Sequence, residues 1–523
     1  MINTDDGMRE SGRMRMGWRY LAWAAVTGLA LATPTGVALA QKTITAAVGI
    51  DPASIDPHKI SGGGDYQFFN HIFEGLYGHD NAGKLAPELA LSHEVSADGK
   101  EYTFKLRPNV KFHNGEAFTA EDVKFSWQRS NDPEIKNPRA AILTRNVVDV
   151  EVIDDLTVKL KLKQPDAALI ENLGEFFYIV DKTTTEKTGN DDVGRHPIGT
   201  GPFRFVSRRI REQTEFAAFP DHWGKKPKID RLVMKMVSDP QTRIAMLRAG
   251  EVDAIVNVPP QVAKQLEADK NVNVIVSPSF QNIFIAISVK AAHGQFANPK
   301  VRQALNHAID RKTLINRVMF GFATPVAVQC NIQITGCDIG KEPYAYDPKK
   351  AKAMLEEAKF DFTRTYEFTG LAPGRAAQSK EVAEAVGFYL GQVGVKTKME
   401  FLEYGAWLAR VSAREYDKQD MFWQNWTDYN NDPMGRLPRA WRTGGSLSWN
   451  SDPVLDEMID AANAFTDPKA REVHLKKLFT HAYDNPPWIF LWTTNEVYAT
   501  RKNVRWTPRA NVSWPVFWVV DKD

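Results

Sequence analysis

Alternation of apolar and polar side chains picks out one compact segment between residues 98 and 129. It begins with the turn dipeptide Asp98-Gly99, and the residues after it alternate at a spacing of two, which is typical of a half-buried strand. The apolar members of this alternation are Tyr102, Phe104 and Leu106. The pattern therefore predicts a tight turn followed by a strand with one buried face.

A second strand and a helix are predicted directly after this strand. Val110 and Phe112 share a face, and Asn114-Gly115 favours a turn with positive φ. Thr119, with Asp122 three residues later, is typical of a capping box, in which each side chain accepts a hydrogen bond from the other residue's backbone NH. The helix that it opens is predicted to bury the face formed by Ala120, Val123 and Trp127.

Further along the chain, apolar runs alternate with segments that begin at a proline. Alternating or β-branched runs predict strands at residues 43–50, 147–152, 157–162, 229–236, 272–276, 284–289, 395–401, 486–492 and 497–500. Helical spacing predicts helices at residues 66–77, 378–393 and 404–416, and after Asp239-Pro240, Asn298-Pro299, Asp347-Pro348, Asp452-Pro453 and Asp467-Pro468. Because helices and strands alternate in the second half, we expect a mostly parallel sheet there.

Length and charge narrow the class of protein. A chain of 523 residues with 43% hydrophobic and 25% charged residues exceeds what one hydrophobic core usually supports, so two or three lobes are expected. Lys and Arg number 66 against 64 Asp and Glu, which leaves no basic excess for binding a phosphate backbone. The composition therefore predicts a soluble protein whose partners do not include nucleic acid.

The first 40 residues have the pattern of a secretory signal peptide. Arg13, Arg15 and Arg19 precede an apolar run at residues 21–32, and Ala38-Leu39-Ala40 has the small-x-small form of a cleavage site. We therefore expect cleavage after Ala40. The acidic residues near the start are unusual ahead of a signal, so Met1, Met14 and Met16 all stay open as the start.

The mature chain is expected to be free in the periplasm. The apolar run of the signal is too short to span a bilayer, and no later run approaches the roughly 20 residues that a membrane helix requires. No cysteine precedes Cys330, so a lipid-anchored lipoprotein is excluded. Cys330 and Cys337 lie seven residues apart in a polar loop, and in an oxidising compartment we expect a disulfide rather than a metal site.

Motifs of catalysis are absent from the sequence. It contains no Gly-x-Ser-x-Gly elbow, no His-Glu-x-x-His and no Cys-x-x-Cys, and the glycines at 62–64 are not followed by a phosphate-loop pattern. His71 and His79 are the only close histidines in the N-terminal half, and their spacing does not suggest metal ligation. We therefore expect no enzyme activity, no cofactor and no metal.

The segment at residues 98–129 resembles the signature of the family 5 extracytoplasmic solute-binding proteins of ABC importers. The resemblance lies in Asp-Gly-x-x-Tyr-x-Phe-x-Leu-Arg-x-x-Val-x-Phe-His-Asn-Gly at residues 98–115, followed by Phe-Thr-Ala-x-Asp-Val at 118–123. Gly-Thr-Gly-Pro at 199–202 is similar to a second family segment. His93 departs from the pattern, since the family often has Trp there. We read His113 as a packing residue.

The resemblance implies an α/β, two-lobed periplasmic-binding-protein fold, with hinged lobes and an extra subdomain inserted in the first lobe. The first lobe is then built from residues 41–60, 196–285 and 490–523, and the subdomain from 61–195. The second lobe is built from residues 286–489. Hinge strands are expected near 280–290 and 485–495.

The resemblance also implies where the solute binds. The aromatic and acidic stretch from Trp423 to Pro433 is similar to the loop that carries an Asp for the ligand's α-amino group in peptide-binding members. Asp428 is one residue short of the family's position, so Asp432 is the alternative, and an Asx turn without ligand contact stays open. The expected ligand-binding residues are Asp428, Trp426, Trp423, Asp432, Tyr404, Trp407 and, for the opposite end of a peptide, Arg375.

The function implied is that of a periplasmic receptor for a peptide-like solute. It would close two lobes around the solute, act as a monomer and deliver the solute to an inner-membrane ABC permease. The alternatives are the same family with a nickel complex, an opine or an oligosaccharide as solute, and, from another class, a secreted hydrolase.

Overall fold

The computed structural model describes most of the chain beyond the predicted signal peptide. The described residues are 41–59, 63–140, 142, 146–372, 378–428, 432–465, 467–509, 515–517 and 520–522. Across these ranges we find no helix with the length and hydrophobicity that crossing a membrane requires.

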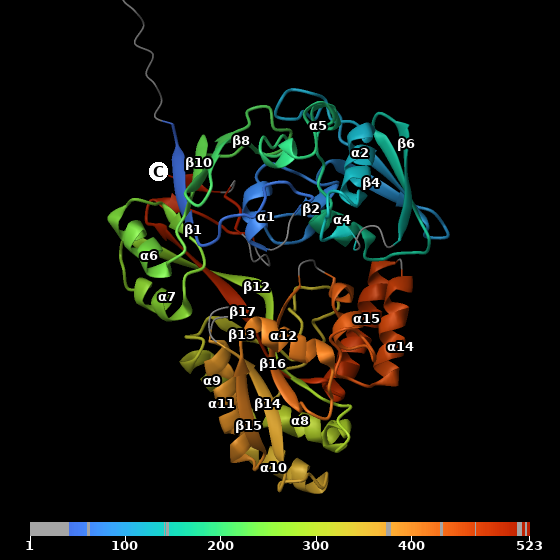
Figure 1. Cartoon of the computed structure of the whole chain (residues 1–523), viewed down its shortest axis with the longest axis vertical. Coiled ribbons are helices and arrows are strands. Elements are labelled where there is room, and N and C mark those ends of the chain that lie inside the picture. Colours follow the sequence, from blue (N-terminus) through green and yellow to red (C-terminus); the bar gives the residue numbers. More distant parts are fainter. Residues whose placement is uncertain are drawn as a thin grey trace, which may run out of the picture. The chain divides into compact units, whose positions relative to one another are not determined.

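One long mixed sheet runs through the described chain (Figure 1). Its strands follow the order β15-β14-β16-β12-β17-β11-β1-β10-β9-β8, and β13 pairs with β17. In chain order they are β1 Thr43–Val48, β8 Phe203–Arg209, β9 Gln213–Ala218, β10 Arg231–Met236, β11 Ala254–Ile255, β12 Val272–Ile287, β13 Ala323–Pro325, β14 Thr365–Leu371, β15 Lys396–Leu402, β16 Met421–Thr427 and β17 Trp488–Arg501.

The two central strands, β12 and β17, are longer than predicted. Residues 272–276 and 284–289 were expected to be separate strands, as were 486–492 and 497–500, but each pair merges into one strand. The merger has a physical cause, because β12 and β17 pair with each other along their length and so satisfy the intervening backbone groups. The register shifts between Pro278 and Asn282, where the pairing is irregular.

Separate hydrophobic cores lie on either side of this irregularity. One core takes β12 from Phe280 onwards and β17 up to Trp492, together with the helices in between. Two others take the opposite parts of the same strands, including Val272 and Val497, together with β1 and β10. The chain therefore forms two lobes, and β12 and β17 pass from one to the other (Figure 1). The two-lobed fold that the resemblance implied is confirmed.

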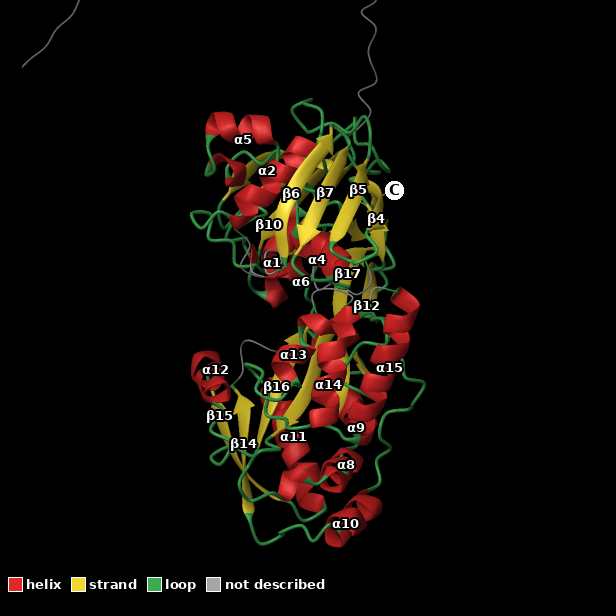
Figure 2. Ribbon diagram, turned by 90° about the vertical axis from the view of Figure 1, so that its right-hand side faces the viewer, coloured by secondary structure: helices red, strands yellow, loops and turns green. Residues whose placement is uncertain are grey.

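The inserted subdomain has its own four-stranded sheet, in the order β4-β5-β7-β6 (Figure 2). Its strands are β4 Ala90–Val95, β5 Glu101–Leu106, β6 Val147–Asp154 and β7 Thr157–Leu162. They pack against α2 Ala120–Asn131 and α4 Leu169–Phe176 in a fourth core. The predicted strand after the Asp98-Gly99 turn is confirmed, and so are the predicted strands at 147–152 and 157–162.

The predicted capping box at the start of α2 is confirmed, since Thr119 and Asp122 exchange both bonds. The strand expected at Val110 and Phe112 does not form. The structure has only an isolated bridge between Lys111 and Ala117, because the turn at Asn114-Gly115 follows too soon for a ladder.

The first helix differs from the prediction. Helix α1 spans Gly63–Phe69, whereas helical spacing had suggested residues 66–77. Phe73 and Leu76 are buried as expected, but they lie in irregular chain that leads into β2 Tyr77–His79 and β3 Leu85–Pro87.

The backbone at Gly199 packs closely against this irregular chain. A Cβ on Gly199 would lie 2.1 Å from the Ile72 carbonyl oxygen, so this close backbone approach requires glycine.

The helices predicted to begin at a proline all do so. Each has an Asp or Asn N-cap whose side chain accepts a hydrogen bond from the first turn. They are α6 Pro240–Ala249, α8 Pro299–His307, α10 Pro348–Glu357, α14 Pro453–Ala461 and α15 Pro468–Asp484. The other helices include α5 Lys182–Thr188, α7 Pro260–Leu266, α9 Arg311–Arg317, α11 Ser379–Gln392, α12 Tyr404–Ala413, α13 Leu437–Ala440 and the 3-10 helix η3 Pro433–Gly435.

The sheet of the second lobe is mixed, not mostly parallel. Strand β14 pairs in parallel with β15 and β16, but β12 pairs antiparallel with β16 and β17. The alternation of helices and strands predicted the parallel half correctly. It could not predict the other half, because β12 and β17 enter this sheet from the first lobe.

Candidate functional site

Asp428 lies at the carboxyl end of β16, next to the irregularity in β12. The stretch from Trp423 onwards was expected to be a loop, but residues 421–427 form a strand paired with β12, with Trp426 opposite Asn282. The paired strand fixes where Asp428 lies, and the Asp428 backbone NH donates to the Phe280 carbonyl at 3.2 Å.

The Asp428 carboxylate is buried and makes two polar contacts through the same oxygen. Oδ2 accepts a hydrogen bond from Asn282 Nδ2 at 3.0 Å and lies 3.1 Å from Arg436 Nη1. Burial raises the pKa of Asp428 to about 6, although the charge of Arg436 and the hydrogen bond from Asn282 act in the opposite direction. Burial likewise lowers the pKa of Arg436. The loss of hydration on burial therefore affects the pKa values of Asp428 and Arg436 more than the attraction between their charges does.

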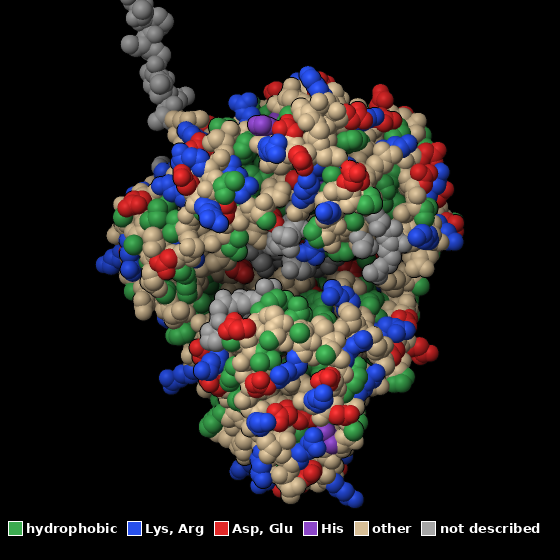
Figure 3. Space-filling model, viewed as in Figure 1, with side chains coloured by type: hydrophobic (Ala, Val, Ile, Leu, Met, Phe, Trp, Pro, Cys, Tyr) green, Lys and Arg blue, Asp and Glu red, His purple; other side chains and the backbone are tan. Residues whose placement is uncertain are grey.

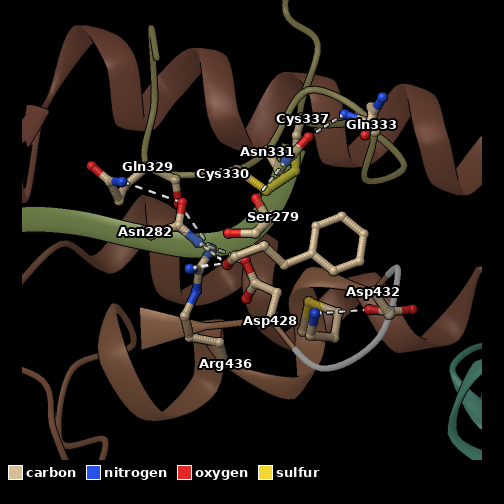
Figure 4. Close-up of a disulfide and its surroundings, with 12 residues drawn as sticks. Ser279, Asn282, Gln329, Cys330, Asn331, Gln333, Cys337, Asp428, Asp432 and Arg436 are labelled. Carbon is tan, nitrogen blue, oxygen red and sulfur yellow. Dashed lines mark hydrogen bonds and ion pairs between the residues drawn. A yellow bond between two sulfur atoms is a disulfide. The ribbon is translucent and has the colours of Figure 1, made fainter. Parts of the chain in front are cut away.

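Gln329 connects this ion pair to both central strands (Figure 4). Its amide nitrogen donates to Asn282 Oδ1 at 3.2 Å and to the Trp492 carbonyl at 3.1 Å, and its backbone carbonyl accepts from Arg436 Nη2 at 2.9 Å. The result is a buried polar cluster, formed by Asn282, Gln329, Asp428 and Arg436, at the passage between the lobes. Sequence reasoning missed three of its members, because no motif joins residues so far apart.

The predicted disulfide lies beside this cluster. Cys330 and Cys337 are bonded, and both are buried. Asn331, inside the closed loop, donates from Nδ2 to the Ser279 carbonyl of β12 at 2.9 Å. Figure 4 shows the disulfide next to Ser279 and Asn331. The bridge therefore holds a loop that contacts β12 where its pairing is irregular.

We expect thiol titration of the exported protein under denaturing, non-reducing conditions to find no free thiol. The Cys330→Ser/Cys337→Ser variant should lose about 2.5 kcal/mol of stability by the chain-entropy argument for so short a loop. Urea unfolding of the two proteins measures this difference. Two titratable thiols in the parent protein would contradict the prediction.

Asp432 has structural partners of its own. Its side chain accepts from the Met434 backbone NH at 2.7 Å, capping η3, and it forms an ion pair with Arg471 of α15. It is almost completely buried. These contacts are those of the Asx turn that the sequence left open as an alternative, and whether a ligand also contacts Asp432 stays a prediction.

The predicted aromatic residues lie at different depths. Trp423 is fully buried in the core of the second lobe, and Trp407 is nearly so, with Nε1 donating to the Trp423 carbonyl at 3.2 Å. Tyr404 is half-buried and stacks on Trp407, with ring centroids 5.9 Å apart. Trp426 is also half-buried, and the Arg439 guanidinium lies 5.6 Å from its ring centroid. Arg375 lies outside the described residues.

The chemistry of the site favours binding. A buried carboxylate, a buried guanidinium and two half-buried rings can recognise a polar solute through hydrogen bonds and stacking. Within the described ranges, no three His, Cys, Asp or Glu side chains come together as metal ligands would. A large cavity lined by described residues lies away from this cluster, between the first lobe and its inserted subdomain.

Sequence comparison connects the chain to one family. The model described as bacterial extracellular solute-binding proteins, family 5 Middle, matches residues 84–448. The chain is 31% identical over 499 residues to the glutathione-binding protein GsiB of Pectobacterium atrosepticum, covering 93% of this chain and 95% of that protein. It is 30% identical over 492 residues to GsiB of Salmonella typhimurium, covering 92% and 95%.

Solved structures share the fold over the same extent. The periplasmic binding protein DppA from Helicobacter pylori, in complex with the peptide STSA, is 26% identical with a TM-score of 0.72, covering 92% of this chain and 98% of that chain. HbpA2 from Haemophilus parasuis is 25% identical with a TM-score of 0.82, covering 92% and 100%. NikA from Brucella suis, in complex with Fe(III)-EDTA, is 25% identical with a TM-score of 0.80, covering 92% and 100%.

Proposed function

Because the chain belongs to the bacterial extracellular solute-binding proteins of family 5, we propose that it is the receptor of an ABC importer for a peptide-like solute. The observation that carries the peptide-like solute is the likeness to glutathione-binding proteins over 93% of the chain. A structural neighbour bound to the peptide STSA supports it. The protein captures the solute between its lobes and delivers it to the inner-membrane permease.

Closure of the lobes is the proposed mechanism, and no covalent step is part of it. Contacts made by both lobes exist only in the closed form, so solute shifts the population towards that form. We place the hinge where β12 and β17 pass between the cores, near residues 276–280 and 493–496. With the hinge there, the proposed second lobe begins after residue 280 and ends before residue 493, a few residues beyond each end of the 286–489 expected from the sequence.

The proposed solute site joins the polar cluster to the half-buried rings. Asp428 binds the solute's ammonium group through Oδ1, since the contacts to Asn282 and Arg436 both use Oδ2. Trp426 and Tyr404 pack on the solute. Trp407 stacks on Tyr404 and donates a hydrogen bond to the Trp423 carbonyl, and these two tryptophans complete the proposed site. Arg375 binds the carboxylate at the other end, and Asp432 stays the alternative to Asp428.

The chain is exported to the periplasm, is cleaved after Ala40 and works as a monomer without cofactor, metal or catalytic activity. Lys and Arg side chains are interspersed with Asp and Glu on the face drawn in Figure 3, which agrees with the near-neutral net charge of +2. Such a surface offers no extended basic patch on that face for nucleic acid.

Mass spectrometry of solute released from protein purified without refolding tests the choice of solute. A peptide or glutathione supports the proposal. A nickel complex or an opine would support the alternatives instead, which are represented among the structural neighbours by the complex of NikZ with Ni(L-His) and that of AgaA with agropinic acid. An oligosaccharide would likewise move the protein to another solute class, and turnover of the solute would favour the hydrolase.

Closure itself predicts a change in size. Small-angle X-ray scattering should show a smaller radius of gyration when the released solute is added back at saturation, because the lobes approach each other. Protein with no solute added is the control. A radius that does not change on saturation would remove the hinge from the mechanism.

A further inference from the structure

A cavity lined by described residues lies between the first lobe and its inserted subdomain. Its volume is about 620 Å³, within the range of small-molecule sites. Its walls come from the chain after α1, from β2 and β3, from α4 and from the loop after β9. The residues that matter for its chemistry are Glu74, Glu88, Glu175, His222, Trp223 and Arg509. The cavity has no part in the solute site proposed above.

The carboxylate of Glu74 is already hydrogen-bonded to three side chains of the protein. Its carboxylate accepts from Thr200 Oγ1 at 2.8 Å, from Trp223 Nε1 at 2.8 Å and from His222 Nε2 at 3.0 Å. This arrangement joins the inserted subdomain to the first lobe, and it gives Glu74 a structural role. It also assigns the ring proton of His222 to Nε2, which leaves Nδ1 as an acceptor.

Two buried acceptors of the cavity wall have no partner among the described residues. They are Oε1 of Glu175 and Nδ1 of His222. Glu175 is 3% exposed, and its other oxygen lies 3.7 Å from His79 Nδ1. Buried polar atoms are almost always hydrogen-bonded, so each exception asks for an explanation. Because both atoms are acceptors, the missing partner is a hydrogen-bond donor.

The charged side chains on the inner wall of the cavity also favour a ligand that donates hydrogen bonds and carries positive charge. Three carboxylates, those of Glu74, Glu88 and Glu175, accompany one buried guanidinium, that of Arg509. Burial raises the pKa of Glu88 to about 8, with the charge of Glu74 adding to the effect, and it raises the pKa of Glu175 well above its ordinary value. Burial therefore disfavours the charged form of these two carboxyls, and a cation bound beside them would favour it.

We propose that this cavity binds a small organic cation with a primary ammonium or guanidinium group, held by Glu175 and Glu88. Nδ1 of His222 accepts a further hydrogen bond from the cation, and the indole of Trp223 forms part of the apolar wall. The lysines that line the cavity, Lys225, Lys226 and Lys228, are exposed to solvent and lie at its rim. A ligand of this class differs from a peptide in needing no free carboxylate.

The test uses a matched series of four-carbon probes on the full mature chain. Butylamine, butan-1-ol and butyrate have nearly the same size and differ in charge, and isothermal titration calorimetry at low salt compares their affinities. We expect butylamine to bind at one site and at least tenfold more tightly than either of the others. Tighter binding of butyrate would overturn the proposal, because it would assign the cavity to anions through the rim lysines.

Variants of the cavity carboxylates test whether butylamine binds in this cavity. Glu175→Gln should lower the affinity for butylamine at least tenfold, and Glu88→Gln provides the same test if the first variant does not fold. Glu171→Gln is the matched control, because Glu171 lies one turn earlier on α4 and contacts the opposite nitrogen of His79 at 3.5 Å. Unchanged binding in both cavity variants, or equal loss in the control, would overturn the proposal.

Discussion

Replacing Arg436 by Met is expected to lower the free energy of unfolding by about 3 to 5 kcal/mol. The change removes the cationic partner of Asp428 and leaves a carboxylate buried in the core of the second lobe. Urea unfolding of the parent and the variant measures the difference. Arg442→Met is the matched control, because Arg442 forms its pair with Asp460 in solvent, and such pairs contribute only about 0 to 1 kcal/mol.

The same reasoning predicts that replacing both partners costs less than the two single changes together. Burial shifts the pKa of Asp428 upwards and that of Arg436 downwards, so each charge is held at the expense of its hydration. The variant Asp428→Leu/Arg436→Met leaves no charge behind, and a coupling of about 1 to 3 kcal/mol is expected between the two changes. Effects that simply add would show that the pair is not coupled.

The sequence predicted the features that depend on neighbouring residues and missed those that depend on residues far apart in the chain. The capping box of Thr119 and Asp122 and the proline-initiated helices depend on neighbours within four residues, and these predictions are confirmed. Helix α1 was predicted wrongly, because Phe73 and Leu76 are buried by tertiary packing and not by helical periodicity. The merged strands β12 and β17 were missed for the same reason, since each is held by a partner about 200 residues away.

The candidate site depends even more on residues that are far apart in the chain. Sequence patterns indicated Asp428 and its aromatic neighbours, but the environment of Asp428 depends on Asn282, Gln329 and Arg436, which three separate segments contribute. No local spacing indicates such a cluster. Removing the charge of Asp428 is therefore expected to destabilise the empty protein as well, because Arg436 would then be buried without a counter-charge.

Asp428→Asn is expected to weaken binding of a peptide with a free amino terminus at least tenfold. A carboxylate and an ammonium group enclosed together form a charge-assisted hydrogen bond, and removing one partner of such a buried pair costs about 2 to 5 kcal/mol, of which 1.4 kcal/mol already corresponds to tenfold. Calorimetry with the released peptide, at a temperature where the variant is fully folded, separates this effect from the lower stability. The N-acetylated form of the peptide should bind parent and variant alike.

Asp432→Asn supplies the control for the register of this site. Asp432 caps η3 and pairs with Arg471, so the change should lower stability while leaving the affinity of the folded protein within about twofold of the parent. Loss of affinity in Asp432→Asn but not in Asp428→Asn would move the ammonium site to Asp432, the alternative that the sequence left open. Normal binding by both variants, or equal binding of free and N-acetylated peptide, would refute recognition of the amino terminus. A neutral solute would then fit the site better, because the aromatic rings at Trp426 and Tyr404 can stack on it without any charge.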